Sequence, residues 1–358
     1  MKKIFFAVLF VILLAGCGNN NKESIIKKWS KKVDGMDSYL MKGTLEIYRN
    51  EDLYTYDLES AYLKKDKFRV GLTNKTNNHE QIILKNDKGV YVVTPSLNKS
   101  FKFQSEWPYN NSQIYLLQPL LIDLKNDENS KFEEKKDKYI FTTKVNYIND
   151  KNLIKEKIYL DKNLNLKKVE VMDDNDDVIM RLKVTKVDTN NNFDNNYFEV
   201  PDNKNDSNIK EKNNIKEKNT NDVNNSKDNK EKEEIEEKKE NTESKTTSKI
   251  TETLYPMYVP VDTYLDTQDV VSIDKGTRTI LTFTGDSPFT FVQSPVDSET
   301  VDYLNGDPAL VADGIGAVSD KSVAWISNDK EFYLTSTNVN ADELLMIADS
   351  LSVAEVGK

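Results

Sequence analysis

Residues 82–93, IILKNDKGVYVV, decide the fold of this chain. Two apolar runs, residues 82–84 and 90–93, flank a polar segment that ends at Gly89. A glycine at this point supplies the positive φ angle that a tight turn between two strands requires. The stretch therefore predicts an antiparallel β-hairpin, and similar patterns recur on both sides of it.

Short segments of alternating apolar and polar residues recur between residues 45 and 187, and turn-forming residues separate them. Besides the hairpin, they comprise residues 45–47, 54–58, 61–63, 68–70, 139–145, 154–160, 166–172 and 178–187. Nine or ten short strands in hairpin order are typical of an antiparallel barrel or a strongly curved sheet. Alternation turns one face of each strand inward, so the sheet encloses either a packed core or an apolar cavity. We therefore expect a mainly β (α+β) fold.

A helix precedes these strands. Ile25, Trp29 and Val33 recur at four-residue spacing, with lysines on the other face, and Gly35 ends the pattern. This spacing predicts an amphipathic helix that packs one face on the sheet.

A second helical segment interrupts the strands at residues 107–124, which we name the lid segment. Almost every residue from 114 to 124 is apolar. Ser112 is a plausible N-cap, and we expect Pro119 to kink or split the helix. Such an apolar helix must pack on something, most simply over the open mouth of the curved sheet.

The lid segment also holds the residues that we predict to form a ligand or partner surface. Trp107 and Tyr109 combine a large apolar area with a polar edge, as residues at a cavity mouth or an interface often do. The predicted surface adds Tyr115, Leu116 and Leu117 from the same segment. The alternative is that these side chains simply plug the core of the sheet.

The N-terminal residues 1–18 read MKKIFFAVLFVILLAGCG. The apolar run at residues 4–14 suits a signal peptide and is too short to span a bilayer, which takes about 20 residues. Residues 14–17, LAGC, have the form of a bacterial lipobox. We therefore predict that residues 1–16 are removed and that Cys17 receives a diacylglycerol and a further acyl chain such as palmitate. These chains would anchor the protein on the extracytoplasmic face of a membrane, the forespore or spore membrane included. The alternative is an ordinary secretion signal that happens to contain a cysteine.

The mature chain divides at residues 202–250, where aromatic residues are absent and apolar ones rare. Such a segment cannot bury enough apolar surface to offset the entropy of ordering it, so we predict a disordered charged linker. A transient helix held by lysine–glutamate pairs is the alternative. The linker would separate a half-barrel domain, residues 17–201, from a C-terminal domain, residues 251–358.

The predicted C-terminal domain is a small α+β unit. Its strand patterns comprise residues 278–284, 289–293, 322–326 and 331–336. Asn340, with Glu343 three residues later, has the form of a capping box and predicts the start of a closing helix. The apolar face of that helix comprises Leu344, Leu345, Ile347, Ala348 and Leu351.

The composition excludes several kinds of chemistry. Cys17 is the only cysteine and His79 the only histidine, so zinc sites built from His and Cys are excluded by count. No nucleophile motif accompanies His79, as a catalytic triad would require. The acidic run at residues 173–177 lacks the glycine and the terminal glutamate of a calcium loop, so we predict a hairpin turn there. A formal net charge of -10 argues against nucleic acid as a partner. We predict no cofactor, no metal and no catalytic residue. An enzyme that uses two carboxylates stays open, without a supporting motif.

Several segments resemble the LolA/LppX-like half-barrel family. They are residues 91–103 (YVVTPSLNKSFKF), 106–110 (EWPYN), 115–117 (YLL) and 161–171 (DKNLNLKKVEV). Within that family the resemblance is to the GerS-related and YdcC-like sporulation and germination lipoproteins of endospore-forming bacteria. Residues 256–260 (PMYVP), 283–285 (FTG) and 324–326 (AWI) resemble the small domain behind the half-barrel of YdcC-like proteins. The resemblance implies a curved antiparallel sheet with a helical lid over a hydrophobic cavity.

The resemblance also implies a function. GerS-like lipoproteins are implied to support an N-acetylmuramoyl-L-alanine amidase that modifies cortex peptidoglycan, so we expect a non-enzymatic accessory protein of sporulation or germination. LolA carriers are soluble, whereas Cys17 would fix this chain to a membrane, which favours docking over carrying. Two alternatives stay open. One is a lipid-binding or lipoprotein-carrier protein that uses the cavity. The other is an envelope sensor resembling RseB, in which a half-barrel and a small domain restrain an anti-sigma factor.

Overall fold

The computed structural model describes residues 21–49, 52–147, 150–189, 191–201, 252–297, 301–312, 314–327 and 329–353. The predicted lipidation site at Cys17 and the predicted linker at residues 202–250 lie outside these ranges. The helices are α2 (Lys22–Asp34), α3 (Leu117–Asn126) and α4 (Ala341–Asp349), with a short 3-10 turn, η1 (Pro95–Leu97).

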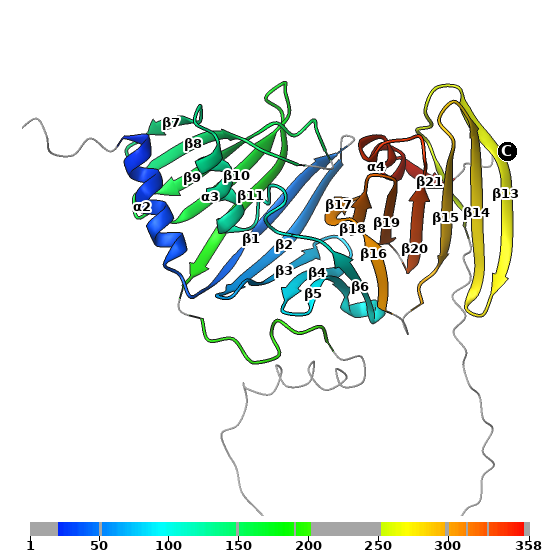
Figure 1. The fold of residues 1–358 in the computed structure, drawn as a ribbon, viewed down its shortest axis with the longest axis horizontal. Coiled ribbons are helices and arrows are strands. Elements are labelled where there is room, and N and C mark those ends of the chain that lie inside the picture. Colours follow the sequence, from blue (N-terminus) through cyan, green and yellow to red (C-terminus); the bar gives the residue numbers. More distant parts are fainter. Residues whose placement is uncertain are drawn as a thin grey trace, which may run out of the picture.

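The larger of the two main sheets is curved and twelve-stranded, and we call it the main sheet (Figure 1). Its strand order is β16-β6-β5-β4-β3-β2-β1-β11-β10-β9-β8-β7, and each neighbouring pair is antiparallel except β16–β6. Its strands are β1 (Ser38–Arg49), β2 (Asp52–Leu63), β3 (Lys67–Asn74), β4 (Glu80–Asn86), β5 (Gly89–Thr94), β6 (Lys99–Gln104), β7 (Lys131–Glu134), β8 (Lys138–Lys144), β9 (Lys155–Asp161), β10 (Leu166–Met172), β11 (Val178–Asp188) and β16 (Val301–Asn305).

The hairpin predicted at residues 82–93 is confirmed as β4 and β5. Asn86 pairs with Gly89 across the turn, and Gly89 has a φ angle of 141°. The other predicted strands of this part are present, most with shifts of a residue or two. β1 begins seven residues before the predicted segment 45–47, β3 ends four residues after the predicted segment 68–70, and residues 54–58 and 61–63 form one strand, β2. The mainly β class with a curved, open sheet is therefore confirmed.

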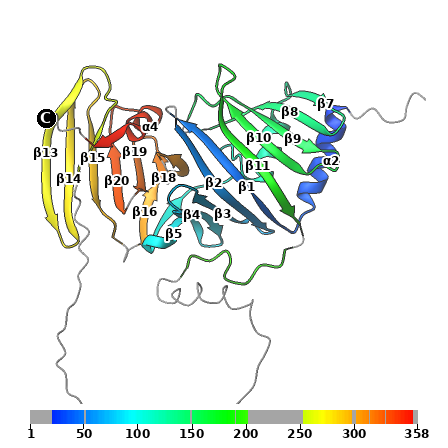
Figure 2. The ribbon, with the colours of Figure 1, turned by 180° about the vertical axis from the view of Figure 1, so that it is seen from behind.

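The concave face of the main sheet holds the core, and α2 and α3 cover it. Ile25, Trp29 and Val33 of α2 are buried, as their spacing predicts, and Gly35 caps the helix. α3 buries Leu120 and Leu124 against the same core. Figure 2 views the molecule from behind, where β1, β2 and β11 lie in front. The layers are thus strands outside and helices inside the curve.

The lid segment departs from its prediction in where its helix begins. α3 starts at Leu117, and Leu116 is its N-cap without a side-chain hydrogen bond. Pro119 lies in the first turn, where backbone N–H groups have no intrahelical acceptor, so it neither kinks nor splits the helix. Ser112 is not the N-cap; its Oγ accepts a hydrogen bond of 2.7 Å from the N–H of Asn146.

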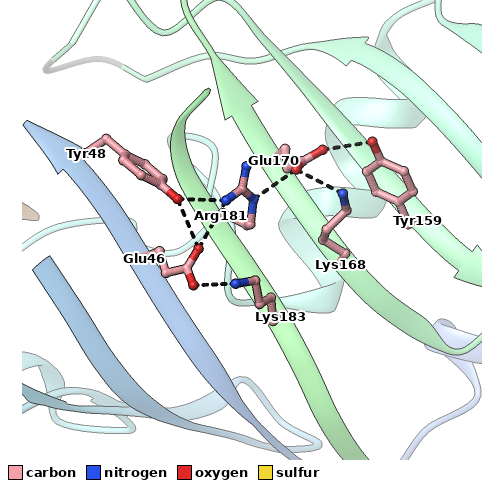
Figure 3. Close-up of polar contacts among 7 residues, drawn as sticks. All are labelled: Glu46, Tyr48, Tyr159, Lys168, Glu170, Arg181 and Lys183. Atoms are coloured by element: carbon pink, nitrogen blue, oxygen red, sulfur yellow. Dashed lines mark hydrogen bonds and ion pairs between the residues drawn. The ribbon is translucent and has the colours of Figure 1, made fainter. Parts of the chain in front are cut away.

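The outer face of the main sheet carries a charged network (Figure 3). It comprises Glu46, Tyr48, Tyr159, Lys168, Glu170, Arg181 and Lys183. Nη1 of Arg181 lies 3.2 Å from Oε2 of Glu46, and its Nε lies 2.9 Å from Oε1 of Glu170. Partial burial would raise the pKa of Glu46, but hydrogen bonds from Lys183 and Arg181 outweigh it and lower that pKa. The outer face is therefore charged and internally compensated, whereas the inner face is apolar.

The acidic run at residues 173–177 forms the hairpin turn between β10 and β11, as predicted. Oδ1 of Asp173 accepts hydrogen bonds from the N–H groups of Asn175, at 3.0 Å, and Asp177, at 2.8 Å. The carboxylate of Asp173 is thus occupied by the turn's own backbone.

The C-terminal part forms a seven-stranded antiparallel sheet, the small sheet, of order β13-β14-β15-β20-β19-β18-β17. Its strands are β13 (Thr263–Ile273), β14 (Gly276–Gly285), β15 (Phe289–Pro295), β17 (Asp307–Val311), β18 (Gly314–Ser319), β19 (Ser322–Ser327) and β20 (Lys330–Thr335). β12 (Leu254–Pro256) and β21 (Leu351–Val353) form a separate antiparallel pair, and β21 follows α4 in the chain. Asn340 caps α4 by accepting a hydrogen bond of 2.9 Å from the N–H of Glu343, as predicted.

The two parts of the chain meet directly. β16, from the C-terminal part, pairs in parallel with β6 at the edge of the main sheet. Across this joint between the two parts, Nζ of the fully buried Lys99 lies 2.9 Å from Oε1 of Glu331, and Nη1 of Arg49 lies 2.6 Å from Oδ1 of Asp349. The core of the main sheet also includes Ile315, Ala317, Ala324 and Ile326. The division into domains at residues 202–250 stays a prediction, and the parts on either side share a sheet and a core.

Candidate functional site

The lid segment places most of its predicted surface residues inside the core. Trp107, Tyr115, Leu116 and Leu117 are all buried. The ring of Trp107 meets the ring of Phe68 edge-on at 6.0 Å between centroids. A partner at the surface does not reach these four side chains unless the segment moves. Whether they bind anything stays a prediction.

Tyr109 is the exposed member of the predicted surface, with 43% of its area open. Its ring lies edge-on to Phe68 at 5.9 Å, and Nζ of Lys85 lies 5.2 Å from its centroid. Partial burial and a hydrogen bond with Asp66 raise the pKa of the Tyr109 hydroxyl. The hydroxyl is therefore protonated at neutral pH.

Tyr39 attaches the start of α3 to the main sheet. Its hydroxyl donates to Oε1 of Gln118 at 3.1 Å and accepts from the N–H of Leu117 at 3.4 Å. The ring stacks on Tyr62 at 5.5 Å, and Tyr62 contacts Phe68 at 5.1 Å. These rings link the helix to the lid aromatics, so the segment is packed as part of the core.

An unexpected acidic pair lies beneath α3. Glu156, on β9, is fully buried, and neither of its carboxyl oxygens has a hydrogen-bond partner within the described residues. Burial, and then the nearby carboxyl of Asp123, raise the pKa of Glu156 well above its ordinary value. Burial raises the pKa of Asp123 to about 6. Asp123 has a hydrogen bond with Ser112. Buried polar groups nearly always have partners, so the carboxyl of Glu156 is an energetic cost that the rest of the core must offset.

The sequence holds a signal for this acidic pair. On β9, Glu156 precedes Ile158 and Leu160 at intervals of two, and all three side chains are buried. The period of a strand therefore places Glu156 on the inner face. Asp123 has no such signal, because the helical spacing alone leaves its burial undecided.

Two hollows lie at the rim of the curved sheet, and both are lined mainly by polar residues. One, of about 350 Å³, lies between α2 and the end of β11, beside Lys32, Asp37 and Asn191. The other, of about 370 Å³, lies at the end of α3, beside Asp123 and Asp127. Small-molecule sites of this size are ordinarily lined mostly by apolar groups. Meanwhile Trp29, Trp107 and Phe141 fill the concave face.

Within the described ranges, no group of three or more His, Cys, Asp or Glu side chains could hold a metal ion. Of the helices described, none combines the length and the apolar character needed to cross a membrane.

The chain has a close relative in sequence. It is 30% identical over 352 residues to the sporulation protein YdcC of Bacillus subtilis (strain 168). The match covers 96% of this chain and 94% of that protein. The chain belongs to the YdcC family. No protein-family model matches it.

Solved structures similar to this YdcC-family chain are much more distant. The MucA/MucB complex of Pseudomonas aeruginosa holds a chain with 11% identity and a TM-score of 0.32, covering 92% of this chain and 98% of that one. The complex of the CwlD amidase of Clostridioides difficile with the GerS lipoprotein holds a chain with 18% identity and a TM-score of 0.25, covering 49% of this chain and 97% of that one. A LolA superfamily protein of Nitrosomonas europaea gives 14% identity and a TM-score of 0.28, covering 50% and 98%. These similarities are too weak to assign a function.

Proposed function

We propose that this chain is a non-enzymatic lipoprotein of the sporulating cell that binds a cell-wall amidase at the extracytoplasmic face of a membrane. The observation that carries the proposal is the 30% identity with a sporulation protein along nearly the whole chain. Because the match spans both folded parts, it supports a role for the complete architecture rather than for one part.

The membrane anchor rests on the lipobox. Residues 14–17 read LAGC, and Cys17 is the only cysteine available for lipidation. Two or more acyl chains bind a bilayer firmly, whereas one does so only marginally. An anchored protein acts where it is attached, which suits the recruitment of an enzyme better than the transport of a lipid.

The packing of the concave face supports a binding role over a carrier role. A lipid carrier needs an apolar cavity, and here Trp29, Trp107 and Phe141 occupy the inner face of the main sheet. The lid segment is held to that sheet through Tyr39. Partner contacts then fall on exposed surfaces.

The amidase is the proposed partner because of the resemblance at residues 91–110 to the germination lipoproteins. Those proteins are implied to support an N-acetylmuramoyl-L-alanine amidase that acts on cortex peptidoglycan. An accessory role of this kind needs a surface and an anchor, and it needs no catalytic group in this chain.

A deletion strain tests the proposal. Spores without this chain should show normal levels of the amidase but a strong loss of amidase products in the cortex, restored by the wild-type chain. The Cys17→Ser variant, which keeps the signal peptide and loses the acylated thiol, should restore them poorly. Unchanged cortex composition in the deletion strain would overturn the proposal.

A further inference from the structure

β13 is the free edge of the small sheet. It pairs with β14 on one side, and no strand among the described residues pairs with the other side. Figures 1 and 2 both show it in yellow at the end of the molecule opposite to α2. An edge strand presents a row of backbone N–H and C=O groups that can pair with another chain.

The strand is unusually open on both faces. The nine residues from Tyr264 to Ser272 are all exposed. Twelve large hydrophobic side chains are well exposed among the described residues, and seven of them lie between Met257 and Val271. On β13 itself Tyr264 is 63% exposed and Val270 60%. Exposed apolar groups gathered in this way mark interaction sites.

The register explains why these side chains are uncovered. Leu265 pairs with Phe283, and Val270 pairs with Thr279; both partners on β14 are buried. Leu265 and Val270 therefore continue the core face of the small sheet beyond the part that α4 covers. A further strand beside β13 would extend the sheet and bury them.

The charge of the edge selects its partner. Asp262, Asp266, Asp269 and Asp274 lie on or beside β13, and residues 254–274 contain no lysine or arginine. None of the four carboxylates has an ion pair within the described residues. Lys275, which follows β13 in the turn, lies 2.6 Å from Oδ1 of Asp297 through its Nζ, and Arg278, on β14, pairs with Val271. The open side of β13 is therefore acidic as well as apolar.

We propose that β13 is the docking edge for an extended segment of a partner protein that carries lysine or arginine, added to the small sheet as a strand. The proposal rests on the proposed function, for which it names the binding surface. Strand addition supplies main-chain hydrogen bonds, and opposite charges set the choice of partner. A second copy of this chain is disfavoured, because pairing two β13 strands brings like charges together.

A labelled peptide in which lysine and valine alternate is the direct probe. Fluorescence anisotropy should show that it binds the full chain at least roughly tenfold more tightly than a peptide in which glutamate replaces lysine. Hydrogen exchange should show new protection at residues 267–273, the regular stretch after the bulge between Leu265 and Thr267. Equal binding of the two peptides, or protection elsewhere, would overturn the proposal. A dimer in solution that is lost on substitution in β13 would assign the edge to a second copy and also overturn it.

A charge reversal provides the matched variant. Asp266→Lys with Asp269→Lys changes exposed side chains, so it should leave the unfolding curve unchanged and abolish binding of the lysine–valine peptide. The control, Asp174→Lys with Asp320→Lys, changes the net charge equally at exposed turn positions and should bind like the wild type. If both double variants lose binding equally, the effect is one of net charge and the proposal is wrong.

The amidase separates this proposal from the one on which it rests. If the wild-type chain binds the amidase and the β13 double variant does not, both proposals are supported. If both chains bind equally, β13 is not the docking edge and the proposed function stands. If the wild-type chain does not bind, the proposed function fails, and the peptide result alone decides whether β13 accepts a basic strand.

Discussion

Replacing Trp107 tests whether the lid segment is part of the core. Trp107 is fully buried and packs edge-on against Phe68. A buried aromatic side chain of this size removes roughly 150–250 Å² from water, which at about 25 cal/mol per Å² is about 4–6 kcal/mol. Measured large-to-small substitutions at such sites cost about 3–5 kcal/mol. We therefore expect Trp107→Ala to lose about 3–5 kcal/mol of unfolding free energy.

The assay is urea unfolding followed by far-UV circular dichroism, because removing a tryptophan alters the fluorescence signal itself. Tyr109→Ala is the matched control in the same segment. Tyr109 is 43% exposed, so its removal should cost roughly half as much as a buried aromatic. If Trp107→Ala unfolds like the wild type but no longer binds the amidase, Trp107 belongs to a binding surface and our account of the lid segment is refuted.

Three further predictions concern the acidic pair, the joint and the linker. Burial raises the pKa of Asp123 from 3.8 to about 6, so the folded chain keeps a proton that the unfolded chain releases. The stability of the wild type relative to Asp123→Asn should therefore fall by up to about 3 kcal/mol as pH rises through this interval; a difference between the two chains that stays constant or rises in urea titrations would contradict this. Lys99→Ala removes the buried ion pair of 2.9 Å with Glu331 and should cost about 3–5 kcal/mol, whereas a loss below about 1 kcal/mol would show that this ion pair adds little to the joint. Protease should cut within residues 202–250, and the two fragments should elute together from a size-exclusion column; separate elution would show that the β6–β16 joint is too weak to hold them.

Local sequence patterns predicted most of the main sheet, for an identifiable reason. Strands with one buried face alternate in sequence, as Ile158 and Leu160 of β9 do. Turns with a required positive φ angle are marked by glycine, as at Gly89. These signals involve neighbours in the chain, so they are readable without the fold.

Three features had no local signal that could be read correctly. β13 was not predicted because its residues are exposed on both faces, so no alternation of burial shapes its sequence. β18 was missed for the opposite reason, since five consecutive residues from Gly314 are buried. The parallel pairing of β16 with β6 joins residues about two hundred positions apart, and no feature of either segment predicts that it pairs with the other.

The candidate site shows the same limit. The aromatic character of Trp107 and Tyr109 predicts that both bury apolar area. Whether each lies in the core or at the surface depends on Phe68, Tyr39 and Lys85, which come from strands distant in the sequence. The predicted N-cap at Ser112 is wrong because its hydroxyl bonds to the N–H of Asn146 instead, and the predicted kink at Pro119 is absent because the first turn accommodates a proline.

Direct binding to the amidase tests the central claim. The purified full chain, in detergent, is titrated with the N-acetylmuramoyl-L-alanine amidase of the same cell in a calorimeter. We expect saturable binding of one amidase per chain, with a dissociation constant of about 1 μM or tighter, equivalent to roughly −8 kcal/mol. An amidase that is active and folded, yet shows no heat of binding and no change in its turnover of cortex peptidoglycan when the chain is added, would contradict it.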